Sequence, residues 1–536
     1  MQVSDKYGVV YTPDSLAIFV AKLLDIESKK DQREIKTILD PACGEGALLA
    51  ASKKIFGQGP KYIGIDVDKD IKERIVDEYQ ILINDTIIPN RVSNKSSEYW
   101  RRKLGPVDAI IANPPWSSEK RYEKSQLSKS GFTFIDGQYD SYVLFIELSL
   151  KLIVDDGYCA FIIPDSFFEE QNKKLRKHLL DNTQIRVIAR LGEKIFENVN
   201  RATTVIVCKK TQPGNSSELN CFRLDTNNRK QVLENKYNLI DLYNSNLHKV
   251  KQSRFLKNKD YNFNIDLLAS QEKLIDSIKQ HNIDWNTEME FGRGVEISKK
   301  GDIIICPSCK SGQTYSKQKA EITCKTCNKQ IIIKNNQKDI ISCQRSEKNK
   351  PIFVGENIHR YRSKVEKYIE VDIEGINYKE DDLYGATKIL VRKTGLGINA
   401  TIDYDKALTT QTVFILSSIN QTAPLEYFLA LLNSRIVFFY YLTMYGENEW
   451  KSHPYLTKAI LFDLPIKRYE GNDLDQKIVR LCKDLTKEYT RDKDKEIEKL
   501  IVEKYGLNSQ QVKTIYQTIN KMPDLSAIND MKMEGF

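Results

Sequence analysis

No stretch of the 536-residue sequence stays apolar over the roughly 20 residues that a helix needs to span a bilayer. The N-terminal residues Met1–Lys6 lack the apolar core of a secretory signal peptide. Internal repeats and coiled-coil heptads sustained over four turns are also absent from the sequence. These absences argue against a membrane protein, a secreted protein and a repeat array, and they predict a cytoplasmic protein without a membrane partner.

The cysteines are not spread along the chain as in a disulfide framework. Four of the ten form two tight Cys-x-x-Cys pairs, and the others are scattered singly. Without an export signal, metal binding explains such pairs better than disulfides do. The spacing C-x2-C-x14-C-x2-C allows four thiolates to converge tetrahedrally on Zn²⁺. We therefore expect a structural zinc ribbon at about residues 300–345, held by Cys306, Cys309, Cys324 and Cys327; free dithiol pairs are the alternative.

Charge of neither sign dominates. The sequence has 82 basic and 73 acidic residues, a formal net charge of +9 and a pI near 8.7. This mild excess is compatible with a polyanionic partner but does not by itself identify one. The length exceeds that of a single core, so we expect two or three domains.

Short β-branched runs alternate with amphipathic stretches between about residues 35 and 210. This alternation predicts an α/β domain with a mostly parallel sheet covered on both faces. The last two runs have no obvious helix between them, which predicts an antiparallel hairpin at the sheet edge. The expected strands are Lys36–Leu39, Tyr62–Ile65, Asp108–Ala112, Tyr158–Ile163, Ile185–Leu191 and Thr203–Cys208, and the expected helices are Lys69–Tyr79, Tyr139–Val154 and Phe168–Leu180.

The remainder of the chain changes texture twice. Residues 210–285 are polar and rich in asparagine, and we interpret them as a connecting region. Short strand-like runs and turns follow up to about residue 470, and the rest is densely charged with i,i+4 pairs typical of helices. We predict domains at 1–245 and 246–470 and a helical segment at 471–536.

Acidic residues and glycines follow the first strands in a way that predicts a nucleotide-type cofactor pocket. The segment Asp40–Gly46 stands where the first strand gives way to a helix, and its glycines let backbone N–H groups approach a ligand. Asp66 ends the next strand and could accept hydrogen bonds from both ribose hydroxyls. Asp85 follows the next apolar run and could hold the adenine amino group of the cofactor. The alternative is a plain strand–helix turn, and the missing third glycine argues against a conventional NAD pocket.

The segment Asn113-Pro114-Pro115-Trp116 predicts a clamp for an amino group. Two consecutive prolines make a rigid loop with unused carbonyl acceptors after the strand Val107–Ala112. The Asn113 side-chain oxygen and the Pro114 carbonyl can both accept from one exocyclic NH2 group, and Trp116 offers a flat face to a base. The alternative is a Pro-Pro turn with a core tryptophan.

Together these segments resemble the gamma class of N6-adenine DNA methyltransferases, the TaqI/Eco57I type. The resemblance is strong over residues 1–210 and extends over essentially the whole chain, although tyrosine or phenylalanine is commoner where Trp116 stands. It implies a Rossmann-like methyltransferase sheet dependent on S-adenosyl-L-methionine, then a mixed α+β target-recognition domain and a helical C-terminus. The zinc ribbon predicted from the cysteines would be an insertion in the target-recognition domain. The segments that carry it, in family order, are Tyr11-Thr12-Pro13, Asp40–Gly46, Asp66, Asp85, Asn113–Trp116, Asp140–Phe145 and Gly157–Pro164.

The resemblance also implies roles for individual residues. The catalytic set would be Asn113, Pro114, Pro115, Trp116 and Phe196. Phe196 is included because the segment Leu191–Phe196 resembles a family motif whose aromatic residue packs on a flipped adenine. Segments that resemble target-recognition domains supply the candidate DNA contacts Arg360, Arg362, Arg392 and Lys393. The cofactor would contact Tyr11, Thr12, Pro13, Asp40, Pro41, Ala42, Gly44, Gly46, Asp66, Val67, Asp85, Thr86, Asn113 and Pro115.

The function implied is site-specific transfer of a methyl group to the exocyclic amino group of a flipped adenine in double-stranded DNA. The sequence starts almost at Tyr11, which leaves no room for a fused nuclease, so we expect a protein that modifies DNA without cutting it. We also expect the protein to be a monomer. A separately encoded restriction nuclease or defence-system subunits would be its partners. The alternatives are an RNA or protein-amide methyltransferase and a catalytically inactive DNA-binding relative.

Overall fold

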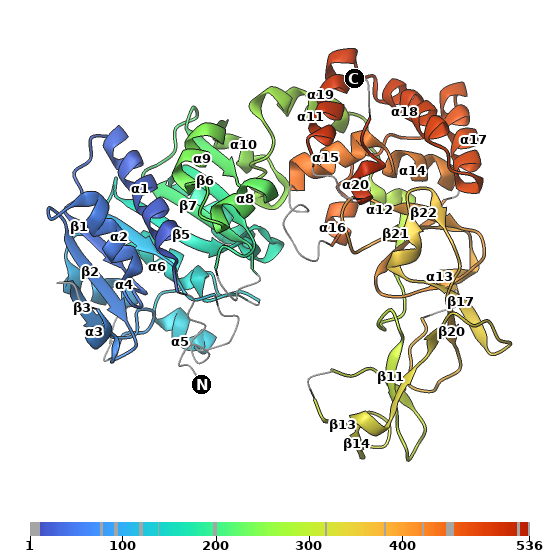
Figure 1. Cartoon of the computed structure of the whole chain (residues 1–536), viewed down its shortest axis with the longest axis horizontal. Helices are drawn as coiled ribbons and strands as arrows, with labels where there is room; N and C mark the ends of the chain where they lie inside the picture. The colour runs from blue at the N-terminus through green and yellow to red at the C-terminus, as the bar shows by residue number, and fades with distance from the viewer. Residues whose placement is uncertain are drawn as a thin grey trace. The chain divides into compact units, whose positions relative to one another are not determined.

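The computed structural model divides into two compact units, and the boundary lies between Ser270 and Gln271. Figure 1 shows an α/β sheet in the first unit and smaller sheets with a group of helices in the second. The structure describes residues 11–75, 79–90, 95–116, 122–137, 139–196, 201–316, 319–379, 382–420, 423–445, 455–522 and 526–533.

The first unit is built on a sheet of nine described strands in the order β3-β2-β1-β4-β5-β7-β6-β8-β9. The strands from β3 to β5 are all parallel, whereas β7 runs antiparallel to both β5 and β6. The strands are β1 (Thr37–Asp40), β2 (Lys61–Asp66), β3 (Gln80–Ile83), β4 (Ala109–Ala112), β5 (Tyr158–Pro164), β6 (Gln184–Gly192), β7 (Thr203–Lys209), β8 (Glu218–Arg223) and β9 (His248–Lys251).

All six strands expected from the sequence are present, and the β6–β7 hairpin is antiparallel as predicted. The prediction that this hairpin forms the sheet edge is wrong, because β8 pairs with β6 and β9 pairs with β8. The interpretation of residues 210–285 as a mere connection is also wrong, since Leu219, Cys221 and Phe222 are buried in the core. The first unit therefore extends beyond the expected boundary at residue 245.

The helices of the first unit cover the sheet in two layers. The chain passes from β1 to β2 in one direction along the sheet and from β4 to β5 in the other, and right-handed crossovers then place α2 and α6 on opposite faces. The expected helix Lys69–Tyr79 is only the short α3, and residues 76–78 lie outside the described part. The helices are α1 (Asp14–Lys30), α2 (Ala47–Phe56), α3 (Ile71–Arg74), α4 (Ser96–Leu104), α5 (Lys124–Lys129), α6 (Tyr142–Leu152), α7 (Lys173–Asn182), α8 (Thr226–Leu233), α9 (Leu239–Asn246) and α10 (Ser253–Leu256).

The second unit contains two four-stranded sheets and several short strand pairs. One sheet has the order β10-β24-β21-β22 and the other the order β16-β20-β17-β23. The strands are β10 (Met289–Arg293), β11 (Asp302–Ile305), β12 (Gly312–Gln313), β13 (Glu321–Thr323), β14 (Gln330–Ile332), β15 (Gln337–Asp339), β16 (Ile341–Ser342), β17 (Asn349–Phe353), β18 (Ile358–His359), β19 (Arg362–Ser363), β20 (Tyr368–Glu370), β21 (Lys388–Arg392), β22 (Ala400–Asp403), β23 (Leu408–Thr409) and β24 (Val413–Ser418).

Helices pack against these sheets, and the residues after 471 form three long ones. Helix α17 packs on α14 and α18, and α19 packs on α15. The helices are α11 (Glu272–Lys279), α12 (Trp285–Glu288), α13 (Asp382–Gly385), α14 (Leu425–Leu432), α15 (Arg435–Tyr445), α16 (Lys458–Leu461), α17 (Asp473–Lys487), α18 (Arg491–Tyr505), α19 (Ser509–Asn520) and α20 (Ser526–Asn529).

Among the described residues, no single helix is long and apolar enough to cross a membrane. Helices α14 and α15, bent by 54° at a short break, reach the required length and composition only as a pair. Nearly all of their side chains are buried within the second unit.

A buried ion network joins the C-terminal helices to the rest of the second unit. Arg360 contacts Asp494 at 2.8 Å, and Arg435 contacts the other oxygen of Asp494 at 2.7 Å. Arg435 also pairs with Glu498 at 3.2 Å, and none of these four side chains is more than 2% exposed. Burial alone would raise the pKa of Asp494, but the two guanidinium groups hold that pKa below its ordinary value.

We predict that Asp494→Asn destabilises the second unit by about 3–5 kcal/mol, because it removes the shared charge between two buried guanidinium groups. Hydrogen exchange of the α18 amides measures the effect. Asp530→Asn is the matched control, since the Arg362–Asp530 pair is nearly half exposed and should contribute less than about 1 kcal/mol. Equal protection of α18 in both variants would contradict the central role of Asp494.

Candidate functional site

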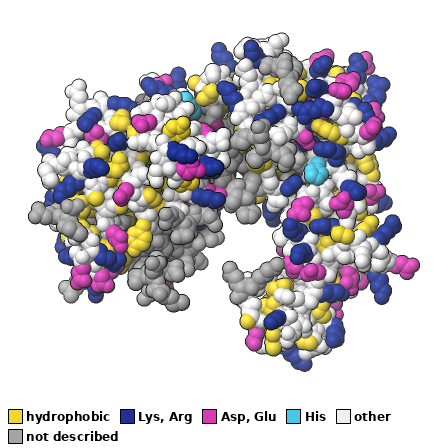
Figure 2. All heavy atoms as spheres, viewed as in Figure 1, with side chains coloured by type: hydrophobic (Ala, Val, Ile, Leu, Met, Phe, Trp, Pro, Cys, Tyr) yellow, Lys and Arg dark blue, Asp and Glu magenta, His cyan; other side chains and the backbone are white. Residues whose placement is uncertain are grey.

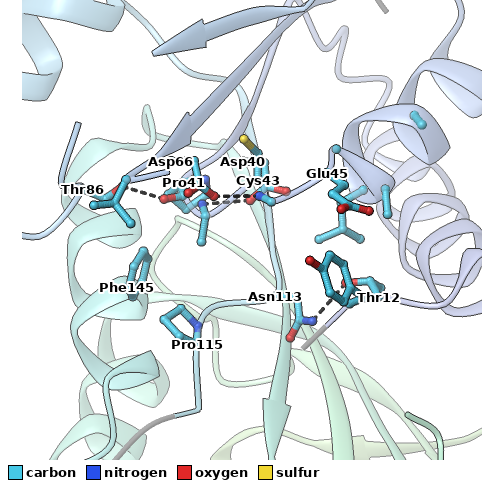
Figure 3. A pocket seen from close by; sticks show the side chains of 18 of the residues that line it. Thr12, Asp40, Pro41, Cys43, Glu45, Asp66, Thr86, Asn113, Pro115 and Phe145 are labelled. Atoms are coloured by element: carbon cyan, nitrogen blue, oxygen red, sulfur yellow. Dashed lines mark hydrogen bonds between the residues drawn. The ribbon is translucent and has the colours of Figure 1, made fainter. Parts of the chain in front are cut away.

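A cavity of about 460 Å³ lies at the carboxyl ends of β1, β2 and β4 in the first unit (Figure 3). The connections from β1 and β4 leave in opposite directions, and this reversal of strand order opens a crevice at the sheet edge. The residues that line it include Tyr11, Thr12, Asp40, Pro41, Ala42, Gly44, Glu45, Gly46, Asp66, Val67, Asp85, Thr86, Asn113, Pro115, Tyr122 and Phe145.

The loop between β1 and α2 is held against the end of β2. Gly44 and Gly46 have φ angles of +46° and +83°, which glycine adopts without strain. The Gly44 N–H donates to the Asp66 carboxylate at 2.9 Å. A Cβ atom at Gly64 would lie 2.7 Å from the Cys43 sulfur, so only glycine permits this close approach. The loop thereby presents its backbone to the cavity.

Hydrogen bonds from nearby groups orient the carboxylates of Asp66 and Asp85. The second oxygen of Asp66 accepts from the Asp68 N–H at 2.9 Å. Asp85 accepts from the Ile87 N–H at 2.9 Å and from the Tyr122 hydroxyl at 2.8 Å. Both carboxylates line the cavity and have little freedom to rotate.

Asp40 is the most enclosed acidic residue of the site, and only 1% of its surface is exposed. Burial raises the pKa of its carboxyl to about 8, although the Ala42 N–H donates to it at 3.0 Å. The negative charge of Asp66 adds to the increase. Asp40 is therefore mostly protonated at neutral pH.

Asn113 stands directly after β4, and its side chain is fixed by the N-terminal segment. Its amide nitrogen donates to the Thr12 hydroxyl at 3.0 Å, which turns the amide oxygen away from Thr12 (Figure 3). The following loop is held by Ser141, whose hydroxyl donates to the Pro115 carbonyl at 2.6 Å. A rigid acceptor thus faces the cavity beside the rings of Pro115 and Phe145.

Trp116 and Phe196, the predicted base-binding pair, pack against each other. Their ring centroids are 5.2 Å apart and the planes meet at 87°. The residues are 7% and 2% exposed, so the two rings contact each other and leave no gap for a base between them. The Trp116 indole N–H is buried and has no acceptor among the described residues. Their predicted role in gripping a base stays a prediction.

The cavity brings together every residue predicted from the sequence to bind the cofactor except Pro13, which instead precedes α1 as its N-cap. Tyr122 and Phe145 line the cavity but were not predicted. Phe145 ends a segment that resembles the family, which was a usable signal. For Tyr122 the sequence offers no comparable pattern.

The prediction that Arg360 contacts DNA is wrong for this structure. Its guanidinium is buried and bound to Asp494 and to the Asn433 carbonyl. Arg362, Arg392 and Lys393 keep part of their surface exposed, so DNA contact by these three stays a prediction.

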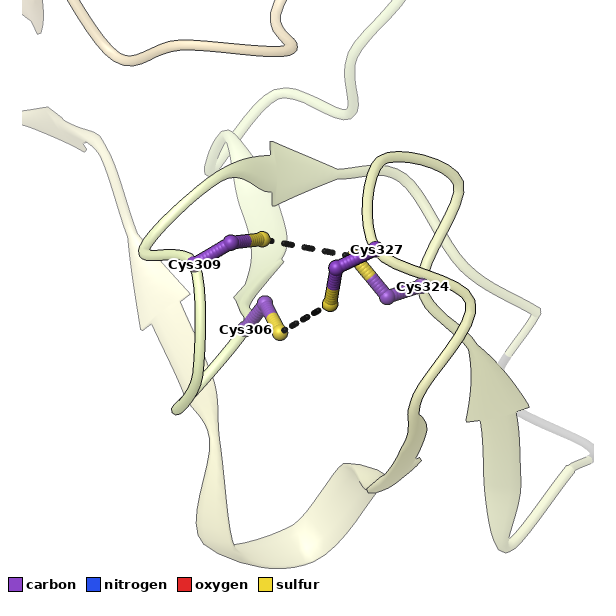
Figure 4. A group of neighbouring side chains, drawn as sticks. All are labelled: Cys306, Cys309, Cys324 and Cys327. Atoms are coloured by element: carbon purple, nitrogen blue, oxygen red, sulfur yellow. Dashed lines mark hydrogen bonds between the residues drawn. The ribbon is translucent and has the colours of Figure 1, made fainter.

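The four paired cysteines converge in the second unit (Figure 4). All four sulfur atoms lie within 4.8 Å of one another, and Cys306–Cys327 and Cys309–Cys324 are each separated by 3.6 Å. A tetrahedral zinc site with bonds of about 2.3 Å has sulfur–sulfur edges of about 3.8 Å. The donor set and its spacing therefore fit zinc, and the mixing of sulfurs from both pairs argues against two separate dithiols.

Two known protein families match this chain, one mainly in the first unit and one in the second. Residues 1–292 match the N-6 DNA Methylase family, which is more than half of the 536 residues. The chain belongs to this family. Residues 350–466 match the TaqI-like C-terminal specificity domain.

Individual relatives are more distant. The chain is 25% identical over 340 residues to the Type I restriction enzyme MjaVII methylase subunit of Methanocaldococcus jannaschii, covering 55% of this chain and 54% of that one. It is 27% identical over 213 residues to the Type II methyltransferase M.AccI of Acinetobacter calcoaceticus, covering 38% and 37%. The chain thus spans about half or less of these relatives. Among solved structures, the chain is similar to the ATP-dependent Type ISP restriction-modification enzyme LlaBIII bound to DNA. The match covers 90% of this chain and 40% of the LlaBIII chain, with 14% sequence identity and a TM-score of 0.49.

We predict that Asp40 makes the protein less stable as the pH rises. Its pKa is about 8 in the folded protein and 3.8 ordinarily, so the favourable contribution is complete below about pH 4 and is lost as the pH rises through 8. Thermal unfolding from about pH 5 to about pH 9 should show wild type losing stability relative to Asp40→Asn, which cannot ionise. A constant difference between the two proteins over this range would contradict the assignment.

Proposed function

We propose that the chain transfers a methyl group from S-adenosyl-L-methionine to the exocyclic amino group of adenine at a specific sequence in duplex DNA. One observation carries the proposal: the glycine loop, two carboxylates and Asn113 line the same cavity in a member of the N-6 DNA methylase family. The match to a specificity domain in the same chain supports a sequence-specific DNA substrate.

The cavity residues suit the cofactor. Asp66 and Asp85 offer carboxylate oxygens for the ribose hydroxyls and for the adenine amino group. The glycine loop offers backbone N–H groups, and Phe145 and Pro115 offer apolar surface. When bound, the cofactor would supply an electrophilic methyl group on a sulfonium, and the glycine loop, Asp66 and Asp85 would hold it in the cavity.

Asn113 then positions the acceptor. With its N–H group held by Thr12, its oxygen can accept from one hydrogen of the target amino group, and the Pro114 carbonyl can accept from the other. Both hydrogens held in this way direct the nitrogen lone pair toward the methyl group. A general base is unnecessary because the amino proton can leave to water after transfer. The target base must leave the duplex, at a cost of a few kcal/mol.

An RNA or protein amide could in principle use the same clamp, because each presents a planar NH2 group. The specificity-domain match favours DNA over these alternatives. We further propose that the chain modifies DNA beside a separately encoded nuclease or defence-system subunit. Its predicted monomeric state and cytoplasmic location remain part of this proposal.

The cysteine cluster is proposed to hold a structural zinc ion. Four thiolates fill a tetrahedral zinc site and leave no position open for catalysis. Among the described residues, the hydrophobic cluster around the site has a small buried core, with Tyr315 and Ile322 partly buried against it: Ile304, Cys306, Cys324, Ile331 and Ile333. Bound metal would add substantially to the stability of so small a core.

The activity test is expression in a methylation-free bacterial host with single-molecule sequencing of its DNA. We expect N6-methyladenine at one short sequence motif. Asn113→Ala should reduce methylation by about 100-fold or more while cofactor binding, measured by calorimetry, changes little. Retained turnover in Asn113→Ala would refute the clamp, and a host genome without modified bases would point to RNA, to protein or to a missing partner subunit.

For the metal, we predict that the purified protein holds one zinc ion per chain and that Cys306→Ser lowers the zinc content and destabilises the ribbon. Metal analysis and hydrogen exchange of residues 302–339 measure the two effects. Cys343→Ser is the control, because Cys343 is exposed and lies outside the cluster. Full zinc content in Cys306→Ser would rule out the tetrathiolate site.

A further inference from the structure

The ribbon carries a concentrated positive charge. Residues 306–338 contain seven lysines and one glutamate, a formal charge of +6 within a chain whose net charge is +9. A zinc ion bound by four thiolates has a formal charge of about −2 and would leave the loaded ribbon at about +4. The surplus therefore exceeds what neutralising the metal site requires.

The lysines are placed by two nearly identical turns. In the first turn the Lys310 N–H donates to the Cys306 carbonyl, and in the second the Asn328 N–H donates to the Cys324 carbonyl. Lys310 and Asn328 both have positive φ angles, of 63° and 59°. Two matched turns of this kind fix the backbone at the ribbon's tip and thus the points from which its lysines extend.

Four lysines of the ribbon, three at these turns and Lys334 after β14, are not used within it. Lys310, Lys325, Lys329 and Lys334 are exposed, and none has an ion-pair partner among the described residues. By contrast, Lys338 at the base of the ribbon pairs with Glu370 at 2.7 Å. The metal end of β11 is also tied to the unit, because the Gly312 N–H beside the first turn donates to the Glu374 carbonyl at 2.7 Å. The four exposed lysines without an ion pair are thus available to a partner.

The ribbon also stands apart from the helices of its unit. Within the second unit, Figure 1 places β13 and β14 at the end away from α17 and α18. Figure 2 shows lysine and arginine side chains on the outer surface of this end and few acidic ones. The ribbon lies between the two segments that match known families, residues 1–292 and 350–466, so neither match assigns it a role.

We infer that the ribbon is a DNA-backbone contact: the ammonium groups of Lys310, Lys325, Lys329 and Lys334 bind phosphates of duplex DNA beside the recognised sequence. Residues 306–338 contain no arginine, the side chain best suited to bidentate reading of bases. Lysine acts as a compact point charge, which suits sequence-independent attraction to phosphate. This inference rests on the proposed function, since it takes the partner to be the duplex DNA that is methylated.

The test compares two quadruple variants of the full-length, zinc-loaded chain. The ribbon variant replaces Lys310, Lys325, Lys329 and Lys334 with glutamine. The control variant makes the same change at Lys477, Lys487, Lys499 and Lys513, four lysines of α17–α19 that carry the same charge and have no ion-pair partner among the described residues. Fluorescence anisotropy measures the Kd for duplex DNA over a range of salt concentrations, and initial rates give kcat and KM for methylation.

We expect the ribbon variant to lose up to about 0.9 of the slope of log K against log salt for each lysine replaced. At moderate salt its Kd and its KM for DNA should rise on the order of 10-fold, with kcat and zinc content unchanged. The control should keep the wild-type slope. A wild-type slope in the ribbon variant, an equal loss in both variants, or a loss of zinc would overturn the inference in favour of a purely structural ribbon.

Failure of the inference and failure of the proposed function give different results. If the wild-type chain methylates and binds duplex DNA but the ribbon variant keeps the wild-type salt slope, only the inference fails. If the wild-type chain neither methylates nor binds duplex DNA, the proposed function fails and the DNA partner falls with it.

Discussion

The cavity of the first unit depends on the close contact between the β1–α2 loop and the end of β2. The Gly44 N–H binds Asp66, and the absence of a side chain at Gly64 leaves space for Cys43. A Cβ atom at Gly64 would clash with the Cys43 side chain and force the loop to shift relative to β2. Burial of Asp40 beneath this loop raises the pKa of its carboxyl to about 8, and the negative charge of Asp66 adds to the increase. The packing of the loop therefore influences both the shape and the charge of the site.

The second unit depends on a different interaction, a charge network excluded from water. Arg360 and Arg435 both come from the region matched to the specificity domain, whereas Asp494 and Glu498 come from α18. Because neither sign can be buried alone without a large cost, the C-terminal helices and the specificity domain must fold as one body. The carbonyls of Asp530 and Met531 also accept from these arginines, which extends the network almost to the end of the described chain.

Local pattern predicted the strands and the cavity well because both are encoded over a few residues. β-Branched runs followed by Asp40, Asp66 and Asn113 identify strand ends directly. Contacts between residues far apart in the sequence could not be predicted from local pattern. Arg360 is 134 residues from Asp494, and the sequence around Arg360 does not distinguish a buried arginine from an exposed one. Strand β8 was missed for a related reason. Its buried residues lie beside the polar, asparagine-rich α8, and the local composition concealed them.

Arginine and lysine divide the work of positive charge in the second unit. Arginine serves where charge must be buried, because its planar guanidinium satisfies several acceptors at once, as Arg435 does with Asp494, Glu498 and two backbone carbonyls. Lysine alone supplies the basic charge of residues 306–338, where the side chains meet water. In the proposed DNA complex, attraction without sequence preference would come from the ribbon. If the chain acts on DNA as proposed, bases would be read by planar guanidinium groups elsewhere in the unit, and Arg362 and Arg392 are the two arginines among the predicted contacts that keep exposed surface.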